Sequence, residues 1–269
     1  KFPADVAILA FAEQNNLREI CNDQAPWFQQ DPLAAQTVIP MFRCPSDSSP
    51  DRITASFVAG VPGQTVGTEF GTSSYIWSIG YNDSLSFGPN FGPRPVDRNS
   101  GVFAFESETT FGSMRDGASN TFAIGEGAGG TPLGEGPGAT VPFAGPTFTE
   151  SVHAWLIQGS NLPSIYGAGI RYAGGWGSTA QPMNKQVTDD SFFDESDPFN
   201  NNPSWGASDT TGTYTASGPH WASNFRSEHA GGGNFWFCDG STQFIQENID
   251  MTTYRQLSCI KDGGVIADY

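Results

Sequence analysis

Apolar side chains recur at roughly helical spacing near the start of the chain, where Ile8, Phe11, Leu17 and Ile20 project onto one helix face. The residues between them include good helix formers such as glutamate, glutamine and arginine. This spacing predicts a helix over residues 6–21.

Shorter apolar runs further along the chain are rich in β-branched and aromatic residues and are bounded by glycine, proline or Asx-type turns. The segments predicted as strands are 36–47, 73–80, 101–105, 121–124 and 152–160. Short strands separated by turn residues are typical of a mainly antiparallel sheet.

The clearest pattern is "SEHAGGGNFWFCDGST" at 227–242, in which Asp239-Gly240 separates two apolar runs. This pair predicts a two-residue hairpin turn, because both turn positions favour positive φ. Counting outward from the turn places Phe235 opposite Phe244. The face predicted to be buried consists of Phe235, Phe237, Thr242 and Phe244.

A short helix is predicted directly after this hairpin. Asp250 is its candidate N-cap, and Ile249 and Tyr254 are spaced for a hydrophobic staple. Leu257 and Ile260 continue the apolar stripe, and two glycines at 263–264 are expected to end the helix.

His229 lies before the first strand of the hairpin and Asp239 lies in its turn. A strand of this length separates them by about 30 Å at ~3.3 Å per residue. We therefore predict that the two side chains do not touch, and that their spacing reflects a strand and not a catalytic pair.

Composition agrees with a β-rich protein, since 33 glycines and 19 prolines in 269 residues indicate many turns and long loops. We predict an α+β fold in which a mainly antiparallel sheet carries long loop insertions, closed by the C-terminal β-hairpin and short helix. Residues 1–269 are expected to form a single domain, with a long polar insertion at about 174–217.

The formal net charge of −16 comes from 28 acidic and 12 basic residues. Such a surface repels polyanions, so no nucleic-acid partner is expected. The acidity favours a soluble extracellular protein and is compatible with cation binding. No apolar run approaches the ~20 residues of a membrane helix.

Four cysteines are spread along the chain without a C-x-x-C spacing, which disfavours a zinc or redox motif. An even number of cysteines in an acidic chain is typical of disulfides formed outside the cell. Four cysteines allow three pairings, of which we favour the sequence-local one, Cys21–Cys44 with Cys238–Cys259.

The strongest candidate for ion binding is the segment "TDDSFFDESDPFNNN", which is rich in carboxylates. Calcium takes six to eight oxygen ligands, and a loop rich in proline and asparagine could wrap such an ion. The expected ligands are Asp189, Asp190, Asp194, Glu195 and Asp197. The competing interpretation is a solvated acidic loop.

Other chemistry has weaker support. His220 and His229 could meet and bind a metal together with a carboxylate. Trp176 and Trp205, if exposed, could stack on sugars, although such residues more often anchor loops. No G-x-S-x-G nucleophile elbow is present, so a hydrolase is disfavoured; a spatial pair of glycosidase carboxylates stays open.

Four segments occur together and in order: "LAFAEQNNL" at 9–17, "FRCPSD" at 42–47, "MRDGASNTFAIGE" at 114–126 and "SEHAGGGNFWFCDGSTQFI" at 227–245. The combination resembles the DUF1559 family, large pilin-like proteins that are abundant in planctomycete-type bacteria. The family has a prepilin-type N-terminus and a C-terminal signature of a histidine, nine residues and Asp-Gly. The matching residues are Asp116, Gly117, Asn120, Glu126, His229, Asp239 and Gly240.

The resemblance implies a non-enzymatic structural subunit of a type IV pilus-like or type II secretion pseudopilin-like filament at the bacterial cell surface. Its partners would be copies of itself or other pilin-like subunits. Family members begin with a long apolar helix that a prepilin peptidase cuts. We expect that helix to be absent from this chain, which opens at "KFP", and membrane contact to occur only through it.

Related secretion pseudopilins hold calcium in a loop of the head, which favours calcium as the ligand of the acidic segment. The alternatives for function are an adhesin that binds polysaccharide or another surface with the same head, and, less favoured, a hydrolase.

Overall fold

A computed structural model describes residues 4–81, 100–103, 108–128, 153–157, 160–161, 171–172, 175–179, 182–184, 223–264, 266 and 269. These residues form a mixed α+β fold with mainly antiparallel sheets and short helices. Within them, no helix combines the length and the apolar character needed to cross a bilayer.

The predicted N-terminal helix is broken into separate pieces. α1 spans Ala4–Ile8, a 3-10 helix η1 continues over Leu9–Ala12, and α2 spans Asn15–Ile20. The break falls at Glu13, whose φ of 57° is in the left-handed region and ends the first segment. The prediction of one continuous helix was therefore wrong. Phe11, which was expected on its buried face, is 88% exposed.

Further short helices lie before the first strand and between later strands. They are η2 Trp27–Gln29, α3 Pro32–Gln36, η3 Pro40–Phe42, η4 Ser56–Gly60, η5 Phe111–Ser113 and η6 Ala118–Asn120. Asp31 caps α3, because its carboxylate accepts a hydrogen bond from the Leu33 N–H. The strand predicted over 36–47 does not form, because Pro40 begins a 3-10 turn that its fixed φ favours.

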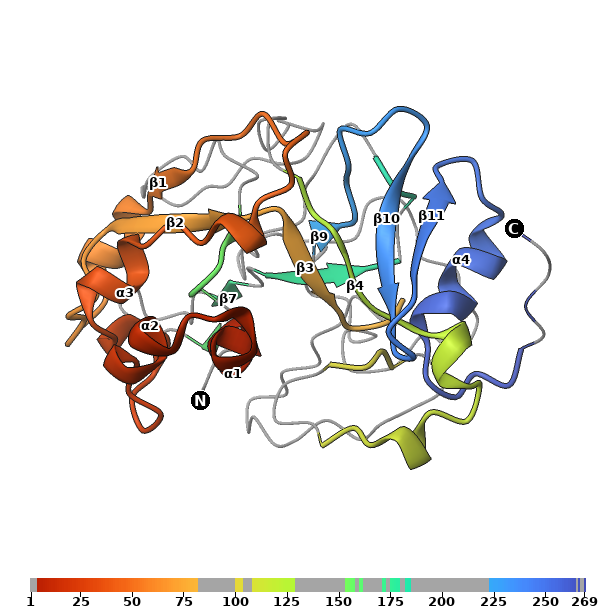
Figure 1. Ribbon diagram of the computed structural model, residues 1–269, viewed down its shortest axis with the longest axis horizontal. Helices are drawn as coiled ribbons and strands as arrows, with labels where there is room; N and C mark the ends of the chain where they lie inside the picture. Colours follow the sequence, from red (N-terminus) through yellow and green to blue (C-terminus); the bar gives the residue numbers. More distant parts are fainter. Residues whose placement is uncertain are drawn as a thin grey trace, which may run out of the picture.

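The first sheet is antiparallel and has the order β1-β2-β5, of which Figure 1 shows β1 beside β2. Its strands are β1 Arg52–Thr54, β2 Glu69–Ser73 and β5 His153–Ala154. The N-terminal helices pack beside this sheet around a hydrophobic cluster, the first core. Its largest fully buried side chains are Leu9, Ile39, Phe70, Trp155, Leu156 and Ile157. A two-stranded ribbon pairs β6 Ser160–Asn161 with β7 Arg171–Tyr172.

The second sheet has the order β11-β10-β4-β3-β8-β9, in which only the β3–β8 and β8–β9 pairs are parallel. Its strands are β3 Tyr75–Ser78, β4 Phe122–Glu126, β8 Trp176–Ser178, β9 Ser223–Asn224, β10 Gly232–Phe237 and β11 Thr242–Gln246. The strands predicted at 73–80 and 121–124 are confirmed as β3 and β4.

Two sequence expectations change at this sheet. Residues 175–179 contain β8, so the start of the polar insertion predicted for about 174–217 is instead part of the sheet. Of the remainder, only 182–184 are described. At the strand predicted over 101–105, the described residues 101–103 form no strand, and the neighbouring Ser100 makes an isolated bridge to Gly80.

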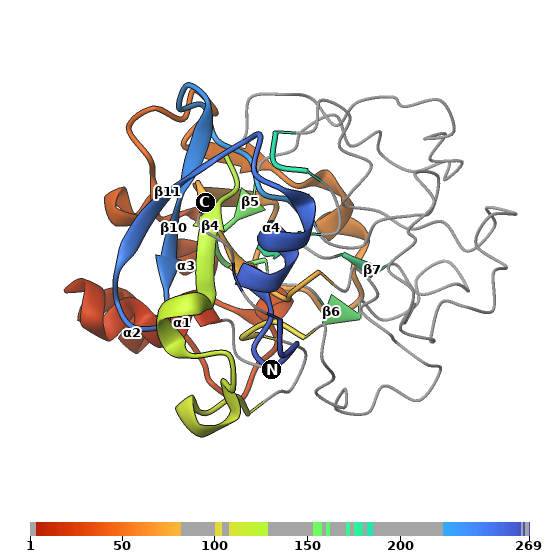
Figure 2. The same cartoon turned by 90° about the vertical axis from the view of Figure 1, so that its right-hand side faces the viewer.

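Aromatic side chains fill the space between this sheet and the last helix, α4 Met251–Ser258, forming the second core. The Phe122 ring lies 4.6 Å from that of Phe235 and 5.4 Å from that of Phe225 between centroids. Such tilted and edge-on pairs each add about 0.5–1.5 kcal/mol beyond area burial. In both views α4 lies beside β4 (Figure 2), and its Tyr254 is fully buried against Phe122.

The C-terminal hairpin forms, but with a register one residue away from the prediction. Phe235 pairs with Gln243, and the loop has three residues, 238–240. Gly240, with φ of 89°, supplies the left-handed position that a three-residue loop requires. A one-residue slip exchanges the faces of the second strand. Ile245 is therefore buried, whereas Phe244, predicted to be buried, is 48% exposed.

The capping prediction for the last helix is confirmed. Asp250 accepts hydrogen bonds from the backbone N–H groups of Thr252 and Thr253 at 2.9 and 3.1 Å. Tyr254 and Leu257 are fully buried, as the apolar stripe predicted. The helix ends at Ser258, earlier than the glycines at 263–264 indicated.

Candidate functional site

A network of polar side chains occupies the junction between the two sheets, where β2 ends at Ser73 and β3 begins at Tyr75. Only Ser74 separates them, so the chain passes directly from one sheet into the other. The Ser74 N–H donates to the Phe42 carbonyl, and the Ser74 carbonyl accepts from the Gly127 N–H, both at 2.8 Å. These bonds hold three separate chain segments together at the junction.

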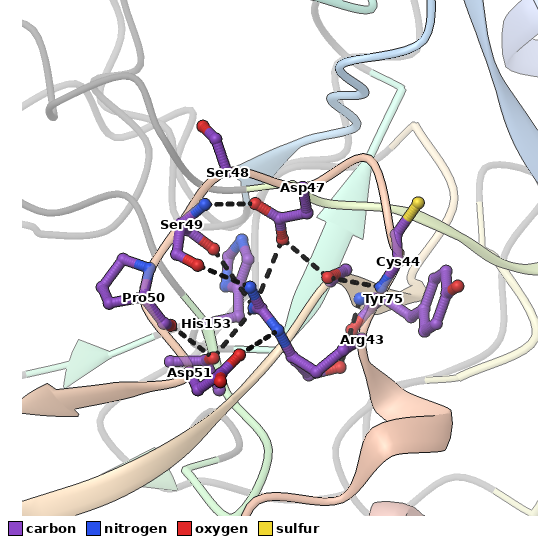
Figure 3. A network of polar contacts seen from close by, with 12 residues as sticks. Arg43, Cys44, Asp47, Ser48, Ser49, Pro50, Asp51, Tyr75 and His153 are labelled. Carbon is purple, nitrogen blue, oxygen red and sulfur yellow. Dashed lines mark hydrogen bonds and ion pairs between the residues drawn. The ribbon is translucent and has the colours of Figure 1, made fainter.

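Arg43 lies at the centre of the network, with its side chain only 10% exposed (Figure 3). Its guanidinium donates to the Thr72 hydroxyl at 2.8 Å and to the Ser49 carbonyl at 2.7 Å. It also lies 3.3 Å from the Asp47 carboxylate and 3.5 Å from that of Asp51. A buried guanidinium with this many partners fixes the loop against β2.

The Asp47 side chain is completely buried and accepts hydrogen bonds from the Ser74 hydroxyl at 2.6 Å and the Ser49 N–H at 2.9 Å. Burial by itself would raise the pKa of Asp47, but these hydrogen bonds and the charge of Arg43 bring it below its usual value. Asp47 is therefore an ionised structural partner of Arg43.

Cys44 points away from this network, as Figure 3 shows, and meets two residues from distant segments. Its Sγ lies 3.6 Å from Oε1 of Glu126 and 3.5 Å from Nε2 of His229. The same Oε1 lies 3.2 Å from the same Nε2. The Glu126 side chain is 3% exposed and that of His229 is 33% exposed, so this group of three, the Cys44 cluster, is reached from solvent on the histidine side.

Neighbouring residues hold the members of the Cys44 cluster in place. Asn234 donates its backbone N–H to Oε2 of Glu126 at 2.9 Å and its side-chain amide to Oε1 at 3.3 Å. The Glu228 carboxylate, next to His229, accepts from the N–H and the hydroxyl of Ser48 at 3.1 and 2.7 Å. The turn before β10 is thus tied to the loop that carries Cys44.

The electrostatics of the Cys44 cluster favour a protonated thiol when no cation is bound. Burial raises the pKa of Cys44, and the Glu126 charge raises it further, against a hydrogen bond from the backbone of Ser46. Burial also raises the pKa of the adjacent Tyr75 to about 12, with Cys44 and Glu126 adding to the shift. Nucleophilic thiolate chemistry is disfavoured in this state.

His153 is a second buried polar residue beside the junction, 3% exposed. Its Nδ1 accepts from the Gly175 N–H at 3.3 Å, and its Nε2 lies 3.4 Å from the Arg226 guanidinium. Burial, and then the Arg226 charge, lower the pKa of His153 to about 3. The imidazole is therefore neutral at pH 7 and links β5 to the segment before β8.

The segment 116–120 forms a structural corner. The Asp116 carboxylate accepts the backbone N–H groups of Asp262 at 2.6 Å and Gly263 at 3.1 Å. The Asn120 amide donates to the Asp116 carbonyl at 2.9 Å, and Gly117 has a φ of 95° that suits glycine. These contacts attach the chain after α4 to the start of β4.

His229 and Asp239 lie at opposite ends of β10. The Asp239 carboxylate accepts from the hydroxyl and N–H of Ser241 at 2.7 and 2.9 Å, and these bonds lower the pKa of Asp239. The two side chains have different partners, as their spacing predicted.

The family model described as a protein of unknown function (DUF1559) matches residues 4–252. The chain belongs to the DUF1559 family. No curated protein and no solved structure matches it.

The disulfides predicted for this DUF1559 chain are not formed, because all four cysteines are free. Cys21 is buried in the first core and donates to the Leu17 carbonyl at 3.4 Å, whereas Cys44 faces Glu126. Cys259 is fully buried and Cys238 only partly. The two cysteines of each predicted pair are close in sequence but lie in different environments.

Several predicted site residues of the DUF1559 chain lie outside the described residues. They are His220, Trp205 and the calcium candidates Asp189, Asp190, Asp194, Glu195 and Asp197. Calcium binding therefore stays a prediction. Trp176, for which sugar stacking was the less favoured alternative to anchoring a loop, is 7% exposed and lies in β8, so it is not an exposed stacking residue.

Sequence reasoning placed Cys44, Glu126 and His229 in three different DUF1559 motifs but did not bring them together. The signal was present, since each motif contributes one residue with a metal-binding or proton-transferring side chain. Their convergence depends on the pairing of β4 with β10 and on the route of the loop before β1, neither of which is visible in the local pattern.

Proposed function

We propose that this chain is the globular head of a pilin-like or pseudopilin-like subunit, a non-enzymatic component of a surface or secretion filament. The proposed location is the bacterial cell surface, and the proposed partners are copies of the same chain or related subunits. Membership of the DUF1559 family and the mixed α+β fold are compatible with this role.

The observation that carries the proposal is the attachment of the first helix to the sheet. In α1 and η1, Val6 and Leu9 are fully buried in the first core. The buried carboxylate of Asp5 accepts a hydrogen bond from the indole N–H of Trp77, on β3, at 3.1 Å. A stalk helix joined to α1 would therefore transmit force directly to the first core and to β3 of the second sheet.

The contacts made by the family motif residues also support a structural role. Asp116, Asn120 and Asp239 satisfy backbone groups of corners and turns. Arg43 and Asp47 bind the junction between the sheets. These residues maintain a shape, which is what a filament subunit requires of its head.

The test is to express the full-length gene with and without a prepilin peptidase and to determine the mature N-terminus by mass spectrometry. We expect peptidase-dependent removal of a short leader ahead of an apolar helix, and recovery of the protein in sheared surface filaments. A mature N-terminus made by another signal peptidase, with no filaments, would contradict the proposal.

Matched variants test the attachment of the first helix. Val6→Asp places a charge in the first core and is expected to abolish filaments by unfolding the attachment. Phe11→Asp changes an 88% exposed neighbour in the same segment and should leave the fold intact. Trp77→Phe removes one donor to Asp5 and should weaken the attachment while keeping the aromatic packing.

A further inference from the structure

Three donor atoms of the Cys44 cluster form a triangle with the dimensions of a metal site. The measured edges are 3.5 Å from sulfur to nitrogen, 3.6 Å from sulfur to oxygen and 3.2 Å from nitrogen to oxygen. Tetrahedral Zn²⁺, with bonds of about 2.3 Å to sulfur and about 2.0–2.1 Å to nitrogen and oxygen, separates these atoms by about 3.5, 3.5 and 3.3 Å. The side chains are thus already spaced as one face of a zinc tetrahedron.

Hydrogen bonding alone accounts less well for this spacing. Charge-assisted bonds between a nitrogen donor and a carboxylate are usually about 2.7–2.9 Å long. The nitrogen–carboxylate pair within the cluster, Nε2 of His229 and Oε1 of Glu126, is 3.2 Å apart. The three cluster atoms surround a common point and are not drawn into close pairs.

The donor set selects the class of ion. A cysteine sulfur and an imidazole nitrogen suit Zn²⁺ and related transition metals, whereas Ca²⁺ and Mg²⁺ require oxygen ligands. The partial exposure of His229 leaves a side open to solvent for a fourth ligand. We propose that Cys44, Glu126 and His229 bind a zinc-class divalent metal ion, with water in the fourth position.

The surroundings orient the Glu126 carboxylate and hold the backbone of the other two ligands. Asn234 orients the Glu126 carboxylate with two hydrogen bonds, and Ser227 accepts the His229 backbone N–H at 3.0 Å. The Cys44 N–H donates to the Ser74 hydroxyl at 2.9 Å. Gly233 keeps space open beside the carboxylate, since a Cβ there would lie 3.2 Å from Oε2.

The ion would connect parts of the fold that are far apart in sequence. Cys44 lies in the loop between η3 and β1, whereas Glu126 ends β4 and His229 precedes β10 in the second sheet. A metal bound to all three stabilises the native state in proportion to its affinity, because the unfolded chain does not hold the ligands together. The bound ion would therefore act as a structural cross-link between the loop that carries Cys44 and the second sheet.

The experiment uses the reduced, chelator-treated protein titrated with Co²⁺, followed by displacement with Zn²⁺. One equivalent of Co²⁺ should give a near-ultraviolet thiolate charge-transfer band and strong visible bands of tetrahedral coordination, both removed by Zn²⁺. Ca²⁺ should displace neither. Absence of the thiolate band would overturn the proposal.

Variants assign the bands to these residues. Cys44→Ser should abolish the thiolate band, whereas Cys238→Ser, at a half-buried cysteine outside the cluster, should retain it. His229→Gln, on a partly exposed turn, should weaken binding at least tenfold without loss of fold by circular dichroism. Asn234→Ala should weaken it by about 10–100-fold. A band that survives both Cys44→Ser and His229→Gln would also overturn the proposal.

Discussion

Replacing His153 by asparagine should change how the stability of the protein depends on pH. His153 is buried with neutral partners on one side and Arg226 on the other, while the Asp47 charge acts weakly in the opposite direction. Its pKa falls from 6.5 in the unfolded chain to about 3 in the folded protein. The unfolded chain therefore binds a proton in this range that the folded protein excludes.

The magnitude follows from proton linkage. Stability is fully present above pH 6.5 and is lost as pH falls toward about 3, by up to about 1.4 kcal/mol for each pH unit. Between pH 7.5 and 4.5 the loss due to His153 is about 2–3 kcal/mol. That is a large fraction of the stability of a typical domain.

The assay is urea unfolding of the wild type and of His153→Asn at several pH values between 4.5 and 7.5. Asparagine retains an acceptor for the Gly175 N–H but does not titrate. At pH 7.5 the variant should be less stable by about 1–2 kcal/mol, because it leaves space in the core. By pH 4.5 the two curves should meet or cross. Carboxylates common to both proteins cancel in the difference, so parallel curves would refute the buried neutral histidine.

Three further sets of substitutions test the second core and the hairpin. Gly232→Ala should prevent the hairpin from closing, because its Cβ would lie 2.1 Å from the Ile245 carbonyl oxygen. The control Gly231→Ala meets open space and should lower stability by only about 1 kcal/mol, because of its positive φ. Equal losses of stability in thermal unfolding would contradict this. Tyr254→Phe should raise stability by about 1 kcal/mol, because the buried hydroxyl has no hydrogen-bond partner among the described residues; a loss in urea unfolding would indicate a partner. Asp250→Ala should lower the melting temperature by removing the α4 cap, and Asp250→Asn should retain most of it.

Features that depend on local backbone chemistry were predictable from the sequence. The Asp250 cap, the strand containing Trp77 and the turn at 239–240 each have a signal within a few residues. The hairpin register was not predictable, because the sequence at 238–240 is compatible both with a two-residue turn and with a three-residue loop that ends in glycine. The difference of one residue decides whether Phe244 or Ile245 enters the core.

The candidate site depends on contacts that no local pattern contains. β8 has three residues and pairs in parallel, which is too short for a periodic signal. The burial of the Arg43 and Asp47 side chains could not be predicted from the sequence, because charged residues are usually exposed. The family motifs identified the right segments, but only the sheet pairing brought Cys44 to Glu126.

The connectivity of the second sheet has a consequence for how the protein is made. Trp77 pairs with Trp176, and Gly125 pairs with Phe235, so residues 99 and 110 positions apart must find one another. Closing such long loops is slow. Because β4 pairs with β10, this part of the sheet cannot form until the long segment between the two strands has been synthesised. During synthesis, β3 and β4 should therefore remain without their partners from the C-terminal half of the chain until β8 and β10 have been made.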